Sequence, residues 1–160
     1  MLYLVMPDKF NMQSPPFDRL SQNQQLQLRS SLDVAYYRER ETLLKPGETS
    51  DHVNILIKGA VEERSADDSE IFAHYANDDI FDIRSQFEET IKHKYIALED
   101  TLSYLLPKRI FLELYSKNGE FAAYFDNNLA KRQELIEAAQ QQQNLAEFIL
   151  TKVDDSIYHP

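Results

Sequence analysis

The chain has 160 residues, which suits one domain of ordinary size or one domain with a helical extension. It contains no Cys, which excludes disulfides, thiolate catalysis and cysteine metal sites and is typical of a cytoplasmic protein. The formal net charge of −10 opposes binding to nucleic acid phosphates. No segment approaches the roughly 18 apolar residues of a membrane span, so we expect neither a nucleic acid nor a membrane as partner.

The N-terminal part of the chain predicts one helix after a short leading segment. We assign residues 1–15 to that segment, because Pro15 and Pro16 interrupt regular structure. Residues 17–32 carry leucines at helical spacing, and Ser21 is placed to cap the helix. Residues 33–44 are rich in Val, Tyr, Thr and Leu, which predicts a strand ended by turn residues at 45–48.

The middle of the chain predicts a series of short strands. Residues 52–58, 60–65, 71–75, 95–98 and 102–106 are apolar or alternating segments separated by turn residues. With residues 33–44 they give at least six strands, with turns about every 8 to 12 residues, the spacing of a β-sandwich, roll or barrel. Gly47 and Gly59 fall at strand ends, where a positive φ is often required, and we assign them as structural turn glycines.

Helices return at the C-terminal end. Pro107 suits a first helical turn because it lacks an N–H group, and residues 108–117 predict a helix that Gly119 ends. Residues 120–152 predict a long helix with a narrow apolar stripe, which a homodimer could use as a seam. The stripe includes Leu135, Ala138, Gln142, Leu145 and Ile149. The glutamines at 140–143 interrupt it, either as a low-complexity tract or as a polar position that sets the register of a dimer.

This order of elements resembles cyclic-nucleotide-binding domains, and several segments carry the resemblance. Residues 16–20 resemble the entry helix of the family, and residues 44–59 resemble its buried strand between two turn glycines. Asp79-Ile80-Phe81 resembles the strand before the phosphate cassette, and Leu105-Leu106-Pro107 with Phe111 resembles the exit from the roll. The resemblance covers about residues 16–126. It implies a mainly β fold, a jelly-roll-like β-roll with an N-terminal helix and a long C-terminal helix.

The phosphate cassette departs from the pattern of the resembled family. There a Gly-Glu pair and a later Arg hold the ribose and the cyclic phosphate. Aligned on Phe81, this chain has Asp82 and Ile83 at the pair, and Ile91, or Lys92 with a shorter loop, at the Arg. We therefore expect weak or absent binding of cAMP and cGMP. The ligand site implied by the resemblance, a degenerate phosphate cassette, comprises Phe81, Asp82, Ile83, Arg84, Ser85 and Lys92.

Arg84 has two interpretations within this cassette. It could serve another anion, or it could form a surface ion pair with Asp82 that contributes at most about 1 kcal/mol. The second interpretation needs no ligand and is the simpler one. We therefore name no cofactor for this chain. A cyclic nucleotide or another nucleotide is the alternative.

Within the family, residues 97–107 look most like bacterial proteins that join this domain to a CBS pair and a nucleotidyltransferase domain, and residues 151–160 resemble their linker. We therefore divide the chain into residues 1–15, the roll at 16–126, a helix at 127–152 and a linker at 153–160. The expected role is regulatory or sensory, with downstream domains of the same polypeptide as partners. The alternatives are a ligand-free dimerisation domain and, third, a truncated transcription regulator of the catabolite-activator type.

No catalytic or metal motif supports an enzyme. The four histidines lack metal-binding spacing, and nucleophile-elbow, phosphate-loop and dinucleotide-binding motifs are absent. Adjacent acids such as Asp67-Asp68 predict solvated turns rather than catalytic pairs. We expect this chain to be neither an enzyme nor a metal-binding protein, while a longer parent could carry the nucleotidyltransferase.

Overall fold

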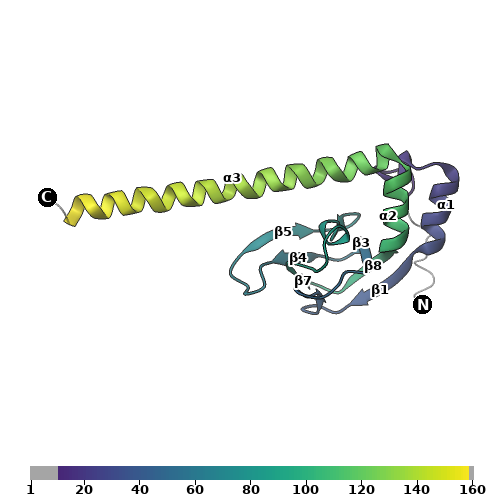
Figure 1. The fold of residues 1–160 in the computed structure, drawn as a ribbon. Coiled ribbons are helices and arrows are strands. Elements are labelled where there is room, and N and C mark those ends of the chain that lie inside the picture. The colour runs from purple at the N-terminus through teal and green to yellow at the C-terminus, as the bar shows by residue number, and fades with distance from the viewer. Residues whose placement is uncertain (1–10, 159–160) are drawn as a thin grey trace. The chain divides into compact units, whose positions relative to one another are not determined.

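The computed structural model describes residues 11–158 and, after residue 134, the side chains of Glu137, Ala138, Gln141 and Leu145 only. The chain forms two compact units, Met1–Phe125 and Asp126–Pro160. The first holds two four-stranded antiparallel sheets flanked by helices, as predicted for a β-roll (Figure 1). Its elements are η3 (Phe17–Arg19), α1 (Gln22–Ser31), β1 (Asp33–Tyr37), β2 (Thr42–Leu44), β3 (His52–Lys58), β4 (Val61–Arg64), β5 (Ile71–Tyr75), β6 (Ile80–Phe81), η4 (Arg84–Gln86), β7 (Lys94–Ala97), β8 (Thr101–Pro107) and α2 (Lys108–Lys117).

The N-terminal helix is shorter than predicted, but its cap is confirmed. Ser21 and Gln24 form a capping box: Ser21 Oγ accepts from Gln24 N at 3.2 Å, and Gln24 Oε1 accepts from Ser21 N at 3.0 Å. The box satisfies two backbone N–H groups at the start of α1. Residues 17–19 form the separate turn η3, because extended backbone at Leu20 and Ser21 interrupts the helix.

The strand predicted over residues 33–44 is two strands in two different sheets. β1 lies in the sheet with order β1-β8-β3-β6, and β2 lies in the sheet with order β2-β7-β4-β5. The break comes at Arg40, whose φ of 72° lies in the left-handed region that few non-glycine residues adopt. This turn moves the chain from one sheet to the other, and no glycine or proline marks it in the sequence.

The helical end also differs in detail from the prediction. Pro107 is the last residue of β8 and precedes α2, because its backbone is extended with ψ of 136°. α2 has the predicted range, but the break after it lies at Asn118, and Gly119 begins the next helix, α3 (Gly119–Tyr158). α3 includes residues 153–158, which the sequence had suggested as linker.

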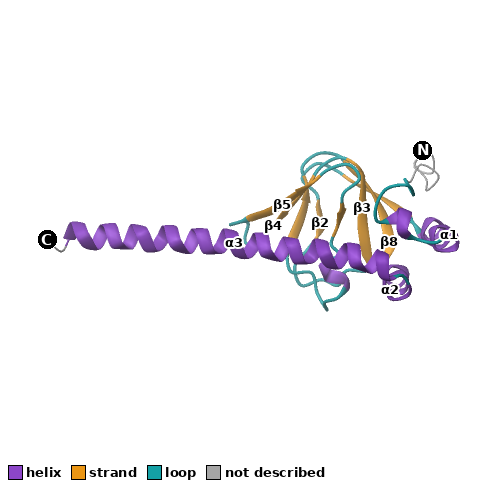
Figure 2. Cartoon of the chain, turned by 90° about the horizontal axis from the view of Figure 1, so that it is seen from above, coloured by secondary structure: helices purple, strands orange, loops and turns teal. Residues whose placement is uncertain are grey.

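Two apolar clusters hold the first unit together. In the larger one, helices pack on the sheet that contains β3 and β8, and Phe111, Phe121 and Phe125 meet with ring centroids 5.0 to 6.0 Å apart. In both views α1 and α2 lie side by side at one end of the strands (Figure 2). Burying a Phe side chain contributes about 1.5 to 3 kcal/mol, so residues 121 and 125 of α3 belong to this core.

The smaller cluster lies between the sheets. Its buried members are Leu56, Val61, Phe81 and Tyr95. The Phe81 ring contacts the rings of Tyr75 and Tyr95, with centroids 5.1 Å and 5.4 Å away, and these two rings also contact each other at 6.2 Å. Phe81 is 1% exposed and therefore fixes the end of β6, from which the predicted cassette begins.

The second unit is helical as far as Tyr158. Of the predicted apolar stripe, Ala138 and Leu145 are exposed, Leu145 at 59%, and the other three side chains fall outside the described ones. Among the described residues, no helix is long and apolar enough to cross a membrane.

Candidate functional site

The predicted cassette begins with Asp82, the residue at the position of the family glycine. Its φ is 66°, a left-handed conformation that glycine adopts without strain and other residues adopt at a cost of roughly 1–2 kcal/mol. The side chain turns into the protein and is 3% exposed. The backbone therefore keeps the conformation of a glycine turn, while the side chain brings a carboxylate into the interior.

Asp82 is held by a hydrogen-bond chain that starts at Gln86, which is 2% exposed. Gln86 Nε2 donates to Asp82 O at 2.8 Å, to His52 O at 3.1 Å and to Ser50 Oγ at 3.1 Å. Ser50 Oγ in turn donates to Asp82 Oδ2. These contacts tie the cassette to the segment that leads into β3, over a sequence separation of 32 residues between Ser50 and Asp82.

Burial raises the pKa of the Asp82 carboxyl to about 6, because the interior disfavours the charged form. The Ser50 and Ser85 hydroxyls act against this and lower the pKa, as does the charge of Lys108. The carboxylate of Glu63 raises the pKa further. At neutral pH the cassette thus contains an ionised carboxylate where the resembled family binds a phosphate.

Glu63 is a second buried carboxylate and lies on β4, 1% exposed. It accepts a hydrogen bond from Tyr75 Oη at 2.6 Å and contacts His93 Nδ1 at 2.5 Å. The His93 ring stacks on Phe72 with centroids 4.1 Å apart. The sequence predicted only an alternating strand here, because the partners of Glu63 come from positions 12 and 30 residues away.

The cations that the sequence offered do not contact Asp82. Arg84 is an exposed side chain whose Nε donates to Glu88 Oε1 at 2.8 Å, so the expected surface pair with Asp82 is wrong. The reason is that Asp82 is buried, whereas Arg84 lies on the surface one turn from Glu88. Lys92 is exposed and contacts Thr90 Oγ1 at 3.3 Å.

Ile83 and Ile91, at two further cassette positions, serve packing. Ile83 packs against the larger core cluster, and Ile91 is 2% exposed. Ser85 is buried as well, at 6% exposure. Neither Ile83 nor Ile91 can offer the hydrogen bond or the charge that a ribose phosphate requires.

The two turn glycines have positive φ angles and different surroundings. Gly47 has φ of 89°, donates from its N–H to Ile91 O at 2.8 Å, and has open space where a Cβ would lie. Gly59 has φ of 118°, and a Cβ there would meet Thr101 Oγ1 at 2.5 Å. Both glycines form turns of the roll that carries the cassette. At Gly59, close packing also requires glycine.

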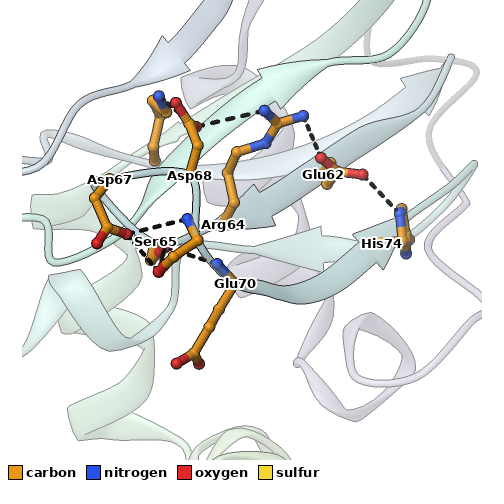
Figure 3. Close-up of polar contacts among 9 residues, drawn as sticks. Glu62, Arg64, Ser65, Asp67, Asp68, Glu70 and His74 are labelled. Carbon is orange, nitrogen blue, oxygen red and sulfur yellow. Dashed lines mark hydrogen bonds and ion pairs between the residues drawn. The ribbon is translucent and has the colours of Figure 1, made fainter.

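A second polar cluster lies on the β4–β5 hairpin (Figure 3). Glu62 forms an ion pair with Arg64, and its Oε2 lies 2.9 Å from His74 Nε2. In the hairpin turn, hydrogen bonds from Ser69 and Ser65 lower the pKa of Asp67 to about 2. This cluster is explained by the hairpin itself. Among the described side chains, no group of three or more His, Asp or Glu could hold a metal ion.

Comparison with known proteins gives the family. The profile of the cyclic nucleotide-binding domain matches residues 34–118, more than half of the chain. No curated protein sequence matches the chain.

Solved structures agree in fold. The sensor domain of the transcriptional regulator DNR from Pseudomonas aeruginosa is 18% identical, with 76% of this chain and 88% of that chain covered and a TM-score of 0.68. The Thermus thermophilus catabolite activator protein is 21% identical, with 83% and 63% covered and a TM-score of 0.66. The regulatory subunit of a cAMP-independent protein kinase A from Trypanosoma brucei is 14% identical, with 86% and 48% covered and a TM-score of 0.66. The chain thus spans less than two thirds of the length of the last two proteins. The match to the family profile shows that the chain belongs to the cyclic nucleotide-binding domain family.

Proposed function

We propose that the chain is a non-catalytic regulatory or sensory module whose cassette binds cAMP and cGMP weakly or not at all. The observation that carries this is the buried Asp82 carboxylate at the glycine position, with Glu63 as a second buried carboxylate. A phosphate beside Asp82 would be repelled by about 1 to 4 kcal/mol, depending on local screening. Ile83 adds the loss of a charged hydrogen bond to ribose, about 1.5 to 3 kcal/mol.

These two effects decide the affinity. Together they correspond to a loss of about two to five orders of magnitude in affinity for cAMP or cGMP, at about 1.4 kcal/mol for each factor of ten. Neither Arg84 nor Lys92 compensates, because both side chains are exposed and bonded to residues other than Asp82.

Calorimetric titration with cAMP and cGMP at pH 7.5 tests the cassette. We expect no binding in the micromolar range by the native chain, and micromolar or tighter binding would overturn the proposal. The double variant Asp82→Gly with Ile83→Glu restores the two family markers, and we expect it to bind cAMP at least about tenfold more tightly. Glu89→Gln is the matched control, since it removes one exposed charge from the same segment and leaves Asp82 in place.

We further propose that the module controls a CBS pair and a nucleotidyltransferase domain in a longer polypeptide. The proposal is supported by the family and by the resemblance of residues 97–107 and 151–160 to such proteins. Reading the gene beyond Pro160 tests it: the two domains would support it, whereas a stop codon or a helix-turn-helix would contradict it.

A second candidate function is dimerisation through α3 without a ligand. Leu145 supports it, because a leucine that is 59% exposed on a helix is available to a partner helix. A thermal-shift screen of nucleotides combined with sedimentation separates the two functions. Stabilisation by a ligand favours the sensor, and a dimer that no nucleotide stabilises favours the scaffold.

A further inference from the structure

The dipeptide Asn118-Gly119 places a reactive side-chain amide next to a residue that does not hinder its reaction. The chain has eight asparagines, and only Asn118 is followed by glycine. The backbone nitrogen after an asparagine can attack the side-chain amide, and a Cβ on the attacking residue obstructs that approach. Neither backbone conformation nor packing explains the glycine, because the φ of Gly119 is not positive and nothing lies within 4 Å of the place where its Cβ would be.

The reaction that this dipeptide favours is deamidation through a cyclic imide. The Gly119 nitrogen bonds to Asn118 Cγ and the bond from Cγ to Nδ2 breaks. The side-chain nitrogen then leaves as ammonia with the proton of the Gly119 N–H group. Water opens the imide at one of its two carbonyls, which gives either aspartate or isoaspartate, whose main chain runs through the side-chain carbon. The net reaction consumes one water, releases one ammonia and needs no other reactant.

The folded backbone holds Asn118 in a conformation that cannot form this ring. Asn118 is extended, with φ of −128° and ψ of 104°. In extended backbone the next nitrogen and Cβ lie on opposite sides of the Cα–C bond, whereas the five-membered ring requires the two to be nearly eclipsed. Both backbone groups of the residue are also engaged. Asn118 N donates to Leu114 O at 2.9 Å, and Asn118 O accepts from Ala122 N at 3.0 Å.

The side chain of Asn118 is held as firmly as its backbone. Its Oδ1 accepts from Phe121 N at 3.0 Å. Its Nδ2, the nitrogen that leaves as ammonia, donates to Arg19 O and to Gln24 Oε1, each at 3.0 Å. We call these four residues, Arg19, Gln24, Asn118 and Phe121, the helix junction. The reaction must break the same contacts that tie the start of α3 to η3 and α1.

We propose that Asn118 is a covalent modification site that the fold keeps unreactive: it deamidates when the helix junction opens, and its product prevents the same contacts from forming again. Aspartate still caps α3, because Asp is as good an N-cap as Asn. An ionised carboxylate cannot donate to Arg19 O or Gln24 Oε1. Isoaspartate lengthens the main chain where α3 begins. The inference goes beyond the proposed function and does not depend on whether the cassette binds a ligand.

The first test compares deamidation in the folded chain and in the chain unfolded in guanidinium chloride, both at pH 8. Mass spectrometry with fragmentation locates the changed residue. In the unfolded chain, Asn118 should react faster than Asn127, which precedes another asparagine. In the folded chain it should react at least about tenfold more slowly, because three side-chain hydrogen bonds must break, each worth roughly two- to tenfold. Equal rates in the two states, or an Asn118 no faster than Asn127 when unfolded, would overturn the inference.

Three variants separate the reaction from its control by the fold. Gly119→Ala adds a Cβ beside the attacking nitrogen and should lower the rate at Asn118 in the unfolded chain to that at Asn127. Gln24→Ala removes one acceptor of Nδ2 and should speed the reaction in the folded chain at least about twofold. Gln22→Ala, at an exposed position of α1, is its control and should leave the rate unchanged. A rate that ignores Gly119→Ala or Gln24→Ala contradicts the inference.

Asn118→Asp reproduces one product directly and tests its consequence. It keeps the cap on Phe121 N and loses the two donor contacts, so its folding equilibrium constant in urea denaturation should be at least about fourfold lower than that of the native chain. An unchanged constant would show that deamidation leaves the helix junction intact and would refute the proposed effect of the modification.

Discussion

At the scale of single residues, Asp82 makes the stability of the roll depend on pH. Its pKa is about 6 in the folded chain, above the usual value of 3.8, so the folded state binds the proton more tightly than the unfolded state. Protonation of Asp82 therefore stabilises the folded chain, and this stabilisation is complete below about pH 4 and is lost as the pH rises through 6. Between pH 5 and 7.5 this amounts to about 1.4 kcal/mol of unfolding free energy.

Asp82→Asn isolates this contribution. Asn tolerates the left-handed backbone and cannot ionise, so the unfolding free energy of the variant relative to the native chain should rise by about 1.4 kcal/mol from pH 5 to pH 7.5. Urea denaturation at both values measures it. Glu89→Gln should show no such change, and a constant difference between Asp82→Asn and the native chain would refute an elevated pKa.

The two turn glycines give a matched pair at the same scale. Gly47→Ala places a Cβ in open space, so only the positive φ is penalised, at about 1–2 kcal/mol. Gly59→Ala adds contact with the backbone of Asp100 and Thr101, both at 2.8 Å, and overpacking costs about another 1–3 kcal/mol. Urea denaturation should rank Gly59→Ala as the more damaging change, and equal losses would contradict the packing argument.

At the scale of elements, Asn118 joins three helices through one side chain. Asn118 Oδ1 accepts from Phe121 N at 3.0 Å and caps α3, while Nδ2 donates to Arg19 O and Gln24 Oε1, each at 3.0 Å. Losing a helix cap costs about 1 kcal/mol and each further hydrogen bond about 0.5 to 1.5 kcal/mol. Asn118→Ala should therefore lower the unfolding free energy by about 2 to 4 kcal/mol in urea denaturation. Asn127→Ala, at an exposed position of α3, should not lower it.

Elements set by local chemistry were predictable from the sequence, and contacts between distant segments were not. The cap at Ser21 and the range of α2 follow from residues within a few positions. The break at Arg40 has no glycine or proline to mark it, and the backbone there is held by a distant segment, since Arg40 N donates to Ala97 O of β7 at 2.7 Å. The buried state of Glu63 and Asp82 depends on partners many residues away, so a local pattern predicts a solvated acid at both positions.

At the scale of the whole molecule, the β-roll fold of the family does not depend on the residues of the cassette. The two antiparallel sheets of the family fold are present, and residue 82 has a left-handed backbone although Asp stands at that position. The frame is stabilised by aromatic and aliphatic packing that needs no ligand, as at Phe81 and Phe111. The charge of a few cassette residues can therefore change without loss of the fold, as the proposed loss of cyclic-phosphate binding requires.

The boundary between the two units predicts how α3 contributes to stability and to association. Among the described residues, the larger core cluster extends along α3 only to Phe125. A chain that ends at residue 128 should unfold in urea with the same free energy as the full chain, at equal protein concentration under conditions where both are monomeric. A chain that ends at Asn118 loses Phe121 and Phe125, at about 3 to 5 kcal/mol each, and should not fold.

The same truncation tests the proposed dimer by sedimentation equilibrium. If α3 is the seam, the full chain is a dimer and the chain ending at residue 128 is a monomer that retains the far-UV signal of the roll. Leu145→Glu in the full chain should weaken the dimer as well, because a charge replaces an apolar side chain at a position that is 59% exposed. Glu137→Gln, at another exposed position of α3, is the control and should leave the dimer intact. A dimer that survives both the truncation and Leu145→Glu would place the interface in the first unit and exclude α3 as its seam.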